Sequence, residues 1–257
     1  MTTHTATHFT LPFTDSRRYR WHGNSSRTGR SMTNFFTADI SKSYDERNNK
    51  LAAIADNMHF LIRLLLKDLP TDARILCVGV GTGAEILSLA RAYPKWSFVG
   101  VDPSMEMLEV CKQNLKNAGI SNPCELIHGY IHDVSNTEKF DAVLSILVGH
   151  FIPRDERIAF YTDMQQRLKT GGYFINTEIS SDLNSAEFPD MLRAWKTLQM
   201  QMGGTDDSIK NIPHLLKNIL SVTSPEETEN FIRSSGIEQP VRFFQAFMIV
   251  GWFGIKG

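Results

Sequence analysis

The chain contains only three cysteines, and it lacks any long uninterrupted apolar run. Three cysteines cannot form an even disulfide framework, which indicates a reducing compartment. The longest apolar candidate, residues 60–66, is interrupted by Arg63 and falls short of the roughly 20 residues that a membrane span needs. The first 15 residues have no apolar segment behind a basic one, so we expect no secretory signal. These absences predict a cytoplasmic protein with no membrane partner.

Net charge is also almost absent. The 257 residues carry 27 basic and 28 acidic side chains, a formal charge of −1. That balance provides no overall field to attract nucleic acid or an anionic membrane. With 42% hydrophobic residues, the length suits one large domain, or one domain with an inserted cap.

Residues 1–35 differ in composition from the rest, because five arginines stand against one acid, Asp15, without helical or strand periodicity. A flexible arm is one interpretation. A second is a lid, in which the arginines and Trp21 meet an anionic or planar substrate. A third is an Arg- and Ser-rich transit peptide. The main domain is expected over 36–257.

Strand-like and helical segments alternate from 74 to 179, after a first helix expected over 45–68. This alternation predicts βαβ units, a parallel sheet and an α/β fold. Beyond 181 it stops, and a helical insertion is expected at about 183–235. The expected strands are 74–79, 96–101, 125–128, 140–147, 173–179, 241–245 and 247–255; the expected later helices are 84–92, 104–118, 155–168, 187–202, 209–220 and 225–234.

A glycine-rich loop, Gly79-Val80-Gly81-Thr82-Gly83, joins the strand at 74–79 to the helix that follows it. Glycines at such a turn let the backbone approach a ligand closely. Asp102 ends the next strand, 19 residues after Gly83, where an acid can accept hydrogen bonds from both hydroxyls of a ribose. The combination predicts a nucleoside-binding site. Because residues 79–84 also satisfy the dinucleotide fingerprint, the loop alone does not select the nucleotide.

Several segments in register resemble the motifs of class I, Rossmann-like methyltransferases that depend on S-adenosyl-L-methionine (SAM). Ile75–Gly83 resembles the first motif, and Val99–Leu108 resembles the acid, turn and helix that follow it. Each match is weak alone, but together they run in the family's order from about 35 to 257. The other matching segments are Tyr44-Asp45, Phe140–Val143, Ser145–Ile152 and Leu168–Phe174.

This resemblance implies a seven-stranded, mostly parallel sheet whose last strand is antiparallel, with helices on both faces. It places the cofactor SAM over the carboxyl ends of the strands. The glycines would lie against its methionine part, Asp102 would hold its ribose, and the turn 129–134 would close over its adenine. The cofactor-binding residues expected on this basis are Gly79, Gly81, Gly83, Asp102, Met105, Tyr130, Ile131 and Leu147.

Two positions depart from the family pattern. Cys77 stands where the family usually has an acid that orients the loop and meets the amino group of SAM. Tyr130 stands where the family usually has an acid for the adenine amine. Asp133 is a candidate replacement for the second acid, and Tyr130 itself is a candidate to stack on adenine. Glu85 is a further acid within the loop region.

Three residues are candidates for a catalytic role. A general base assists methyl transfer when the acceptor is a hydroxyl, an acidic carbon or an ammonium. His150, just past the strand at 140–147, is the first candidate, against the alternative of a structural histidine. Glu178 and Tyr44 are further candidates, with packing or surface roles as alternatives. No metal is expected, because His128 and His132 lack a third ligand nearby.

The predicted function is therefore transfer of the SAM methyl group, with release of S-adenosyl-L-homocysteine (SAH), to a small-molecule acceptor. The carboxyl half also resembles a carboxy-SAM synthase of tRNA modification, through residues 215–220, 224–228 and 242–247. That enzyme carries an arginine near the first segment to grip the extra carboxylate, whereas this chain has Pro213-His214, which favours plain SAM.

Other classes fit the sequence less well. A non-catalytic SAM-binding protein is motivated by Cys77 and Tyr130. A NAD-dependent oxidoreductase is disfavoured because about 75 residues precede the loop and no Tyr-x-x-x-Lys pair exists. Only the Arg-rich residues 1–35 support a nucleic-acid methyltransferase. A homodimer through the insertion helices or the late strands stays open.

Overall fold

The computed structural model describes residues 52–257. The expected arm over 1–35 and the candidate residue Tyr44 lie outside them, as does the beginning of the helix expected over 45–68. The described part of that helix is α2, Ala52–Leu65. Within the described residues, no helix has the length and apolar character to cross a membrane.

A single seven-stranded sheet has the strand order β3-β2-β1-β4-β5-β7-β6. All pairings are parallel except those of β7, which runs antiparallel to β5 and β6. The predicted Rossmann-like sheet with an antiparallel last strand is thus confirmed. The strands are β1 Arg74–Val78, β2 Ser97–Asp102, β3 Cys124–His128, β4 Phe140–Ile146, β5 Leu168–Ile179, β6 Val241–Ala246 and β7 Ile249–Ile255.

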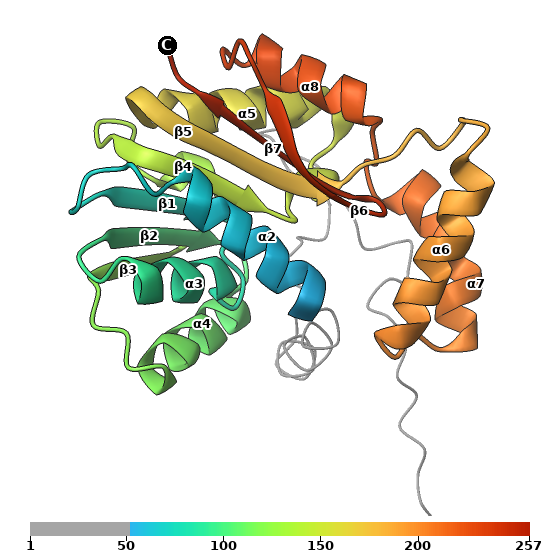
Figure 1. Cartoon of the computed structure of the whole chain (residues 1–257), viewed down its shortest axis with the longest axis horizontal. Helices are drawn as coiled ribbons and strands as arrows, with labels where there is room; N and C mark the ends of the chain where they lie inside the picture. The colour runs from blue at the N-terminus through green and yellow to red at the C-terminus, as the bar shows by residue number, and fades with distance from the viewer. Residues whose placement is uncertain (1–51) are drawn as a thin grey trace, which may run out of the picture.

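Helices cover both faces of the sheet because its central strands are apolar on both sides. Ile75 and Cys77 of β1 share a core cluster with α2, α3 and α4, whereas Leu76 and Val78 share one with α5 and α8. Figure 1 shows α2, α3 and α4 in front of the sheet. The helices that follow α2 on these two faces are α3 Ala84–Ala92, α4 Met105–Asn117, α5 Arg157–Gln166 and α8 Pro225–Ser234.

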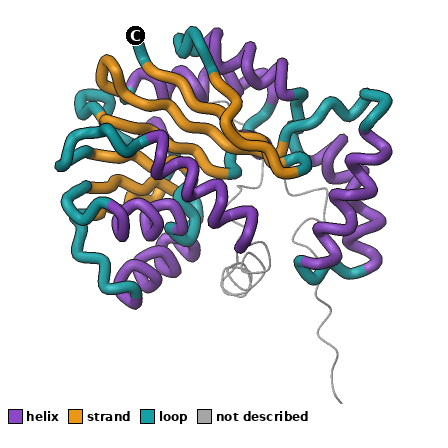
Figure 2. The backbone as a smooth tube through the Cα atoms, viewed as in Figure 1, coloured by secondary structure: helices purple, strands orange, loops and turns teal. Residues whose placement is uncertain are grey.

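Between β5 and α8 the chain forms α6, Phe188–Gln201, and α7, Asp206–His214, followed by a π-helical turn, η5, at Leu215–Ile219. Figures 1 and 2 show α6 and α7 as a pair beyond the carboxyl ends of the parallel strands. The single helix expected over 209–220 is divided instead between α7, which contains Pro213, and η5, which begins at Leu215.

Local signals account for the ends of α4 but not for the start of β5. Ser104 caps α4, since its Oγ accepts the Met107 N–H at 3.2 Å, and Gly119 just past the helix has a φ of +66°. β5 begins at Leu168, earlier than the expected 173, because Leu168 pairs with Phe140 of β4. Gly171 and Gly172 therefore lie within the strand, and both hydrogen-bond to the backbone of Lys256.

Candidate functional site

A pocket opens at the carboxyl ends of β1, β2 and β4. The chain passes from β1 to β2 on one side and reaches β4 on the other, so this edge is a topological switch point, the usual place for a ligand in an open α/β sheet. Most of the pocket wall is apolar, with Asp102 as its carboxylate. The lining residues are Val78, Gly79, Gly81, Val101, Asp102, Pro103, Ser104, Met107, Gly129, Tyr130, Ile131, Ile146, Leu147, Val148, Phe151, Ile152 and Phe160.

The glycine loop is held by the neighbouring strand. The N–H groups of Gly79 and Val80 both donate to the Val101 carbonyl, at 2.8 and 3.1 Å. Gly79 and Gly81 have φ values of +68° and +52°, which side-chain-bearing residues rarely adopt. A Cβ at Gly79 would overlap the Val148 side chain on the opposite wall. Gly79 is therefore required both for the turn and for the space between the two walls.

Asp102 joins the loop to α4 from the end of β2. Its Oδ2 accepts the Gly81 N–H at 2.9 Å, and its Oδ1 accepts the Ser104 N–H at 2.8 Å. Burial raises the pKa of Asp102, while these two hydrogen bonds oppose the rise. Each carboxylate oxygen retains a second lone pair, so the group can still accept hydrogen bonds from a ligand in the pocket.

Two expected cofactor residues lie apart from the pocket lining. Gly83 has a φ of +85° at the start of α3, and a Cβ there would stand 2.6 Å from Cys111 Sγ, so this glycine permits close packing of α3 on α4. Met105 is 46% exposed at the first position of α4. Met107, two residues on and 2% exposed, lines the pocket instead. The spacing of Met105 from Asp102 did not distinguish these two methionines.

The turn after β3 contributes Gly129, Tyr130 and Ile131 to the pocket. Asp133 folds back on this turn, since its Oδ2 accepts the Tyr130 N–H at 2.8 Å. The Tyr130 ring stacks on the His132 ring with centroids 5.6 Å apart. Asp133 thus stabilises the turn, which is a different role from the adenine contact considered for it.

The loop after β4, residues 147–152, forms the facing wall. Leu147 has a φ of +59°, uncommon for a residue with a side chain. Its N–H donates to the carbonyl of Thr177 at 2.8 Å and to Thr177 Oγ1 at 3.1 Å. Backbone strain of this kind, on the order of 1–3 kcal/mol, persists only where surrounding contacts impose it, and here β5 does so.

His150, the first candidate for a general base, is buried in the 147–152 loop. The ring is 4% exposed, and its Nδ1 accepts the Ile179 N–H at 3.2 Å. Burial and the nearby Arg157 lower the pKa of His150 to about 3, so the ring is neutral at pH 7 and carries its proton on Nε2. The structural alternative fits: His150 fastens the 147–152 loop to the end of β5.

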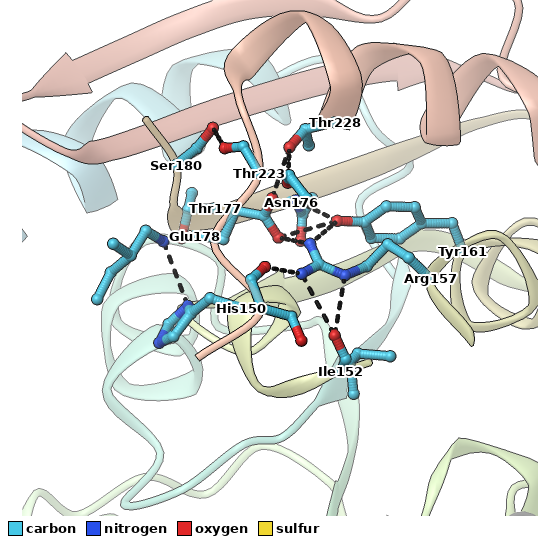
Figure 3. A network of polar contacts seen from close by, with 12 residues as sticks. His150, Ile152, Arg157, Tyr161, Asn176, Thr177, Glu178, Ser180, Thr223 and Thr228 are labelled. Carbon is cyan, nitrogen blue, oxygen red and sulfur yellow. Dashed lines mark hydrogen bonds and ion pairs between the residues drawn. The ribbon is translucent and has the colours of Figure 1, made fainter. Parts of the chain in front are cut away.

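Glu178, the second candidate base, is a buried ion-pair partner of Arg157 (Figure 3). Its Oε2 accepts from Arg157 Nη1 at 2.6 Å and from the Tyr161 hydroxyl at 3.0 Å, and its Oε1 accepts from Thr228 Oγ1 at 2.8 Å. Both ion-pair side chains are 0% exposed. These partners compensate the cost of burying the carboxylate.

Glu85, in the first turn of α3, is the acid buried beside Cys77. Cys77 is fully buried, and burial followed by the charge of Glu85 raises the pKa of its thiol. Glu85 is 5% exposed, and burial, together with nearby Asp102, raises its pKa to about 8. Two acids therefore lie next to the glycine loop, where a positive ligand would relieve their repulsion.

Several wall residues were missed from the sequence. Val148, Phe151 and Ile152 belong to the segment resembling the family loop, but only the fold shows which of its side chains face the pocket. Phe160 comes from α5, and helical periodicity marks it as buried without indicating a ligand.

Comparisons with known proteins agree with this geometry. Residues 75–172 match the family model for a methyltransferase domain. A carboxy-S-adenosyl-L-methionine synthase of Shewanella halifaxensis is 29% identical over 196 residues, which cover 72% of this chain and 77% of that protein. A fatty-acid O-methyltransferase of Mycolicibacterium smegmatis is 30% identical over 130 residues, 50% of this chain and 44% of that protein.

Among solved structures, magnesium protoporphyrin IX methyltransferase from Synechocystis, with bound SAH, has the same fold, with a TM-score of 0.61 at 13% identity over 88% of this chain and 97% of that one. The glycine loop, the acid at the end of β2, the matching domain and the relatives lead to one conclusion. The chain carries a methyltransferase domain at 75–172 on a class I, Rossmann-like fold, and SAM is its cofactor.

Proposed function

We propose that this enzyme methylates a small-molecule acceptor and that SAM occupies the pocket between the glycine loop and the 147–152 loop. The observation that carries the proposal is the position of Asp102, at the switch point between a glycine loop and an apolar wall. Its free lone pairs suit the two ribose hydroxyls. Ile131, Leu147 and Phe160 provide apolar surface suited to adenine.

Glu85 supplies, in this proposal, the negative charge that Cys77 does not. SAM carries a sulfonium and an ammonium, and an acid buried beside the loop gains a favourable partner when such a ligand binds. The raised pKa of Glu85 is the expected state of that acid before the cation arrives. Binding of SAM would then lower the pKa and release a proton.

When bound, SAM would supply a methyl group carried by its sulfonium sulfur: the acceptor would attack the methyl carbon in line with the carbon–sulfur bond, which would break and release SAH. The residues of the chain contribute chiefly by holding the two reactants in that line, a contribution that can account for much of the rate. His150 and Glu178 are both committed to buried hydrogen bonds. Tyr44 therefore stays the proposed residue for any assistance to the acceptor.

We place the acceptor next to the insertion expected at about 183–235. In this proposal the catalytic domain spans 36–257. α6 and α7 stand beyond the carboxyl ends of the strands, on the side from which an acceptor must approach (Figure 1). α6 carries Met191, which is only partly buried where it packs against the core, and a methionine adapts to irregular apolar ligands. The fatty-acid substrate in the name of one relative is consistent with such an acceptor.

A second candidate function, a carboxy-SAM synthase-like activity, is favoured by relatives of that name, one of which aligns over 88% of this chain at 24% identity. Pro213-His214 opposes a carboxy-SAM synthase-like activity, because no arginine able to bind the extra carboxylate stands there. His214 instead hydrogen-bonds to Asn218. Mass spectrometry of the ligand released from the purified protein separates the two: SAM or SAH supports methyl transfer, whereas carboxy-SAM supports the alternative.

Turnover is the test of the proposed function. The full chain is incubated with SAM and a panel of fatty acids and aromatic hydroxy compounds, and SAH release is measured. We expect release with at least one acceptor and none with Asp102→Asn. SAM binding without release across the panel and in cell-metabolite extracts would favour the non-catalytic alternative. Release only with RNA would contradict the small-molecule acceptor.

A further inference from the structure

A polar network inside the protein connects the SAM-pocket wall to both ends of the segment that carries α6, α7 and η5. The network is drawn in Figure 3. At its centre Arg157 of α5 and Glu178 of β5 form the buried ion pair described above. Neither residue lines the pocket, yet the groups they contact belong to its wall and to the base of the insertion.

Arg157 contacts three separate parts of the chain. Its Nη1 donates to Glu178, and its Nη2 donates to the Ser221 carbonyl at 2.7 Å. Nε and Nη2 also reach the carbonyl of Ile152, a pocket residue, at 3.4 Å each. Burial would lower the pKa of Arg157, but the Glu178 carboxylate and the Tyr161 hydroxyl raise it above the ordinary value, so the guanidinium stays charged.

The two ends of the segment that carries α6, α7 and η5 meet at this same place. The N–H of Ser181, just after β5, donates to the Thr223 carbonyl at 3.0 Å, and Ser180 Oγ donates to that carbonyl at 2.8 Å. Ser221, two residues beyond η5, donates its N–H to the His150 carbonyl at 2.9 Å. The segment thus leaves and re-enters the fold beside the 147–152 loop.

We propose that Arg157 is a positioning residue, which holds the 147–152 wall and the base of the insertion in one arrangement so that SAM binding orders α6, α7 and η5. Planar geometry suits arginine to this task, since one guanidinium serves a carboxylate and two carbonyls from different directions. Stability alone does not explain the pair, because apolar replacements of buried ion pairs are often neutral. The inference rests on the proposed SAM pocket and adds a coupling between cofactor and acceptor sides.

Hydrogen–deuterium exchange of the full chain with and without SAM tests the coupling. In the wild type we expect SAM to slow exchange at 129–134, at 147–152 and also across 188–219. Arg157→Lys keeps the positive charge beside Glu178. It loses the guanidinium N–H groups that donate to the carbonyls of Ser221 and Ile152. We expect it to retain protection at 129–134, to lose it at 188–219, and to bind SAM roughly 5-fold or more weakly.

Thr228→Val is the matched control, because it removes the side-chain hydrogen bonds of Thr228 to Glu178 and to Thr223 and leaves the contacts of Arg157 and the Thr223 carbonyl intact. It should lower the melting temperature and keep the SAM-dependent protection of 188–219. If Arg157→Lys does not fold, Arg157→Met/Glu178→Gln, which buries no net charge, replaces it with the same expectation. Protection of 188–219 that is absent in the wild type, or unchanged in the Arg157 variants, would overturn the coupling. Absence of SAM protection everywhere would overturn the cofactor pocket as well.

Discussion

The two walls of the pocket are built in different ways. In the β1 wall Gly79 and Gly81 take left-handed backbone angles, and Asp102 at the end of the neighbouring strand accepts the Gly81 N–H. The β4 wall contains Leu147 at a comparable φ without any glycine at that position. Its shape is imposed from outside, by Thr177 and the Arg157 network. The β1 wall follows from a recognisable glycine loop and strand-end acid, whereas the β4 wall depends on Thr177 and Ser221, which lie 30 and 71 positions from the residues they contact.

The largest loss of stability is expected from disrupting the Arg157–Glu178 ion pair, which holds the β4 wall. Glu178→Ala leaves the Arg157 guanidinium buried without its carboxylate, which should lower the free energy of unfolding by about 3–5 kcal/mol. Urea denaturation measures the change, and Arg242→Ala, which removes an exposed ion pair with Glu229, is the control with an effect of about 1 kcal/mol or less. A stable Glu178→Ala protein that has lost only turnover would restore the catalytic interpretation of Glu178.

Gly79→Ala is expected to disrupt the glycine loop of the β1 wall. The substitution places a Cβ at a φ of +68° and against Val148, so we expect a loss of about 2–4 kcal/mol of stability and no measurable SAM binding. Gly119→Ala is the matched control, because its φ is +66° and no atom lies within 4 Å of the added Cβ. It should lose about 1 kcal/mol and keep its SAM affinity. Equal effects at both sites would mean that the contact between the two walls is unimportant.

Glu85, beside the glycine loop of the β1 wall, should make the stability of the protein depend on pH. The folded pKa of Glu85, about 8, exceeds its ordinary value of 4.5, so between these values the native state holds more protons than the unfolded chain. Stability of the SAM-free protein should therefore fall as pH rises from about 4.5 to 8. Glu85→Gln should flatten that part of the profile.

Glu85 should also release a proton when SAM binds. Calorimetry of SAM binding at pH 7, in buffers of different ionisation enthalpy, should show about one proton released by the wild type and close to none by Glu85→Gln. Proton release that persists in the variant would assign the effect to another group and remove Glu85 from the proposed SAM contacts.

The smallest effect is expected at Met105. Because its side chain is 46% exposed and outside the pocket lining, Met105→Ala should change stability by less than about 0.5 kcal/mol and leave SAM affinity almost unaltered. Met107→Ala, at the buried pocket position, should instead lose about 2–5 kcal/mol. A strong loss of SAM affinity in Met105→Ala would support the role that the family resemblance implies.

Sequence predicted the parts of this molecule that local chemistry determines. The order of strands and helices followed from apolar periodicity, and Ser104 was recognised as a cap because its role involves only the next turn. The glycine loop and Asp102 were recognised because a tight turn and a strand-end acid have few other uses. Leu147, too, was expected near the cofactor, but only by resemblance.

The remainder depends on contacts between distant segments. Nothing around Arg157 in the sequence indicates that it faces Glu178 and Ser221, since those contacts span 21 and 64 residues. His150 and Glu178 have the side chains of a base, and only the fold shows that both are buried and hydrogen-bonded within the protein. The early start of β5 was missed for the same reason, because it depends on pairing with Phe140.

The most direct test of the account is calorimetric titration of SAM into the wild type, Asp102→Asn and Asp141→Asn. Asp141 is 7% exposed, close to the 8% of Asp102, and it also accepts a backbone N–H, but near the start of β4 and away from the pocket. We expect micromolar SAM binding by the wild type and by Asp141→Asn, and a loss of roughly 100-fold or more in Asp102→Asn. Equal weakening in both variants, or no effect in either, would contradict the placement of SAM between these two walls.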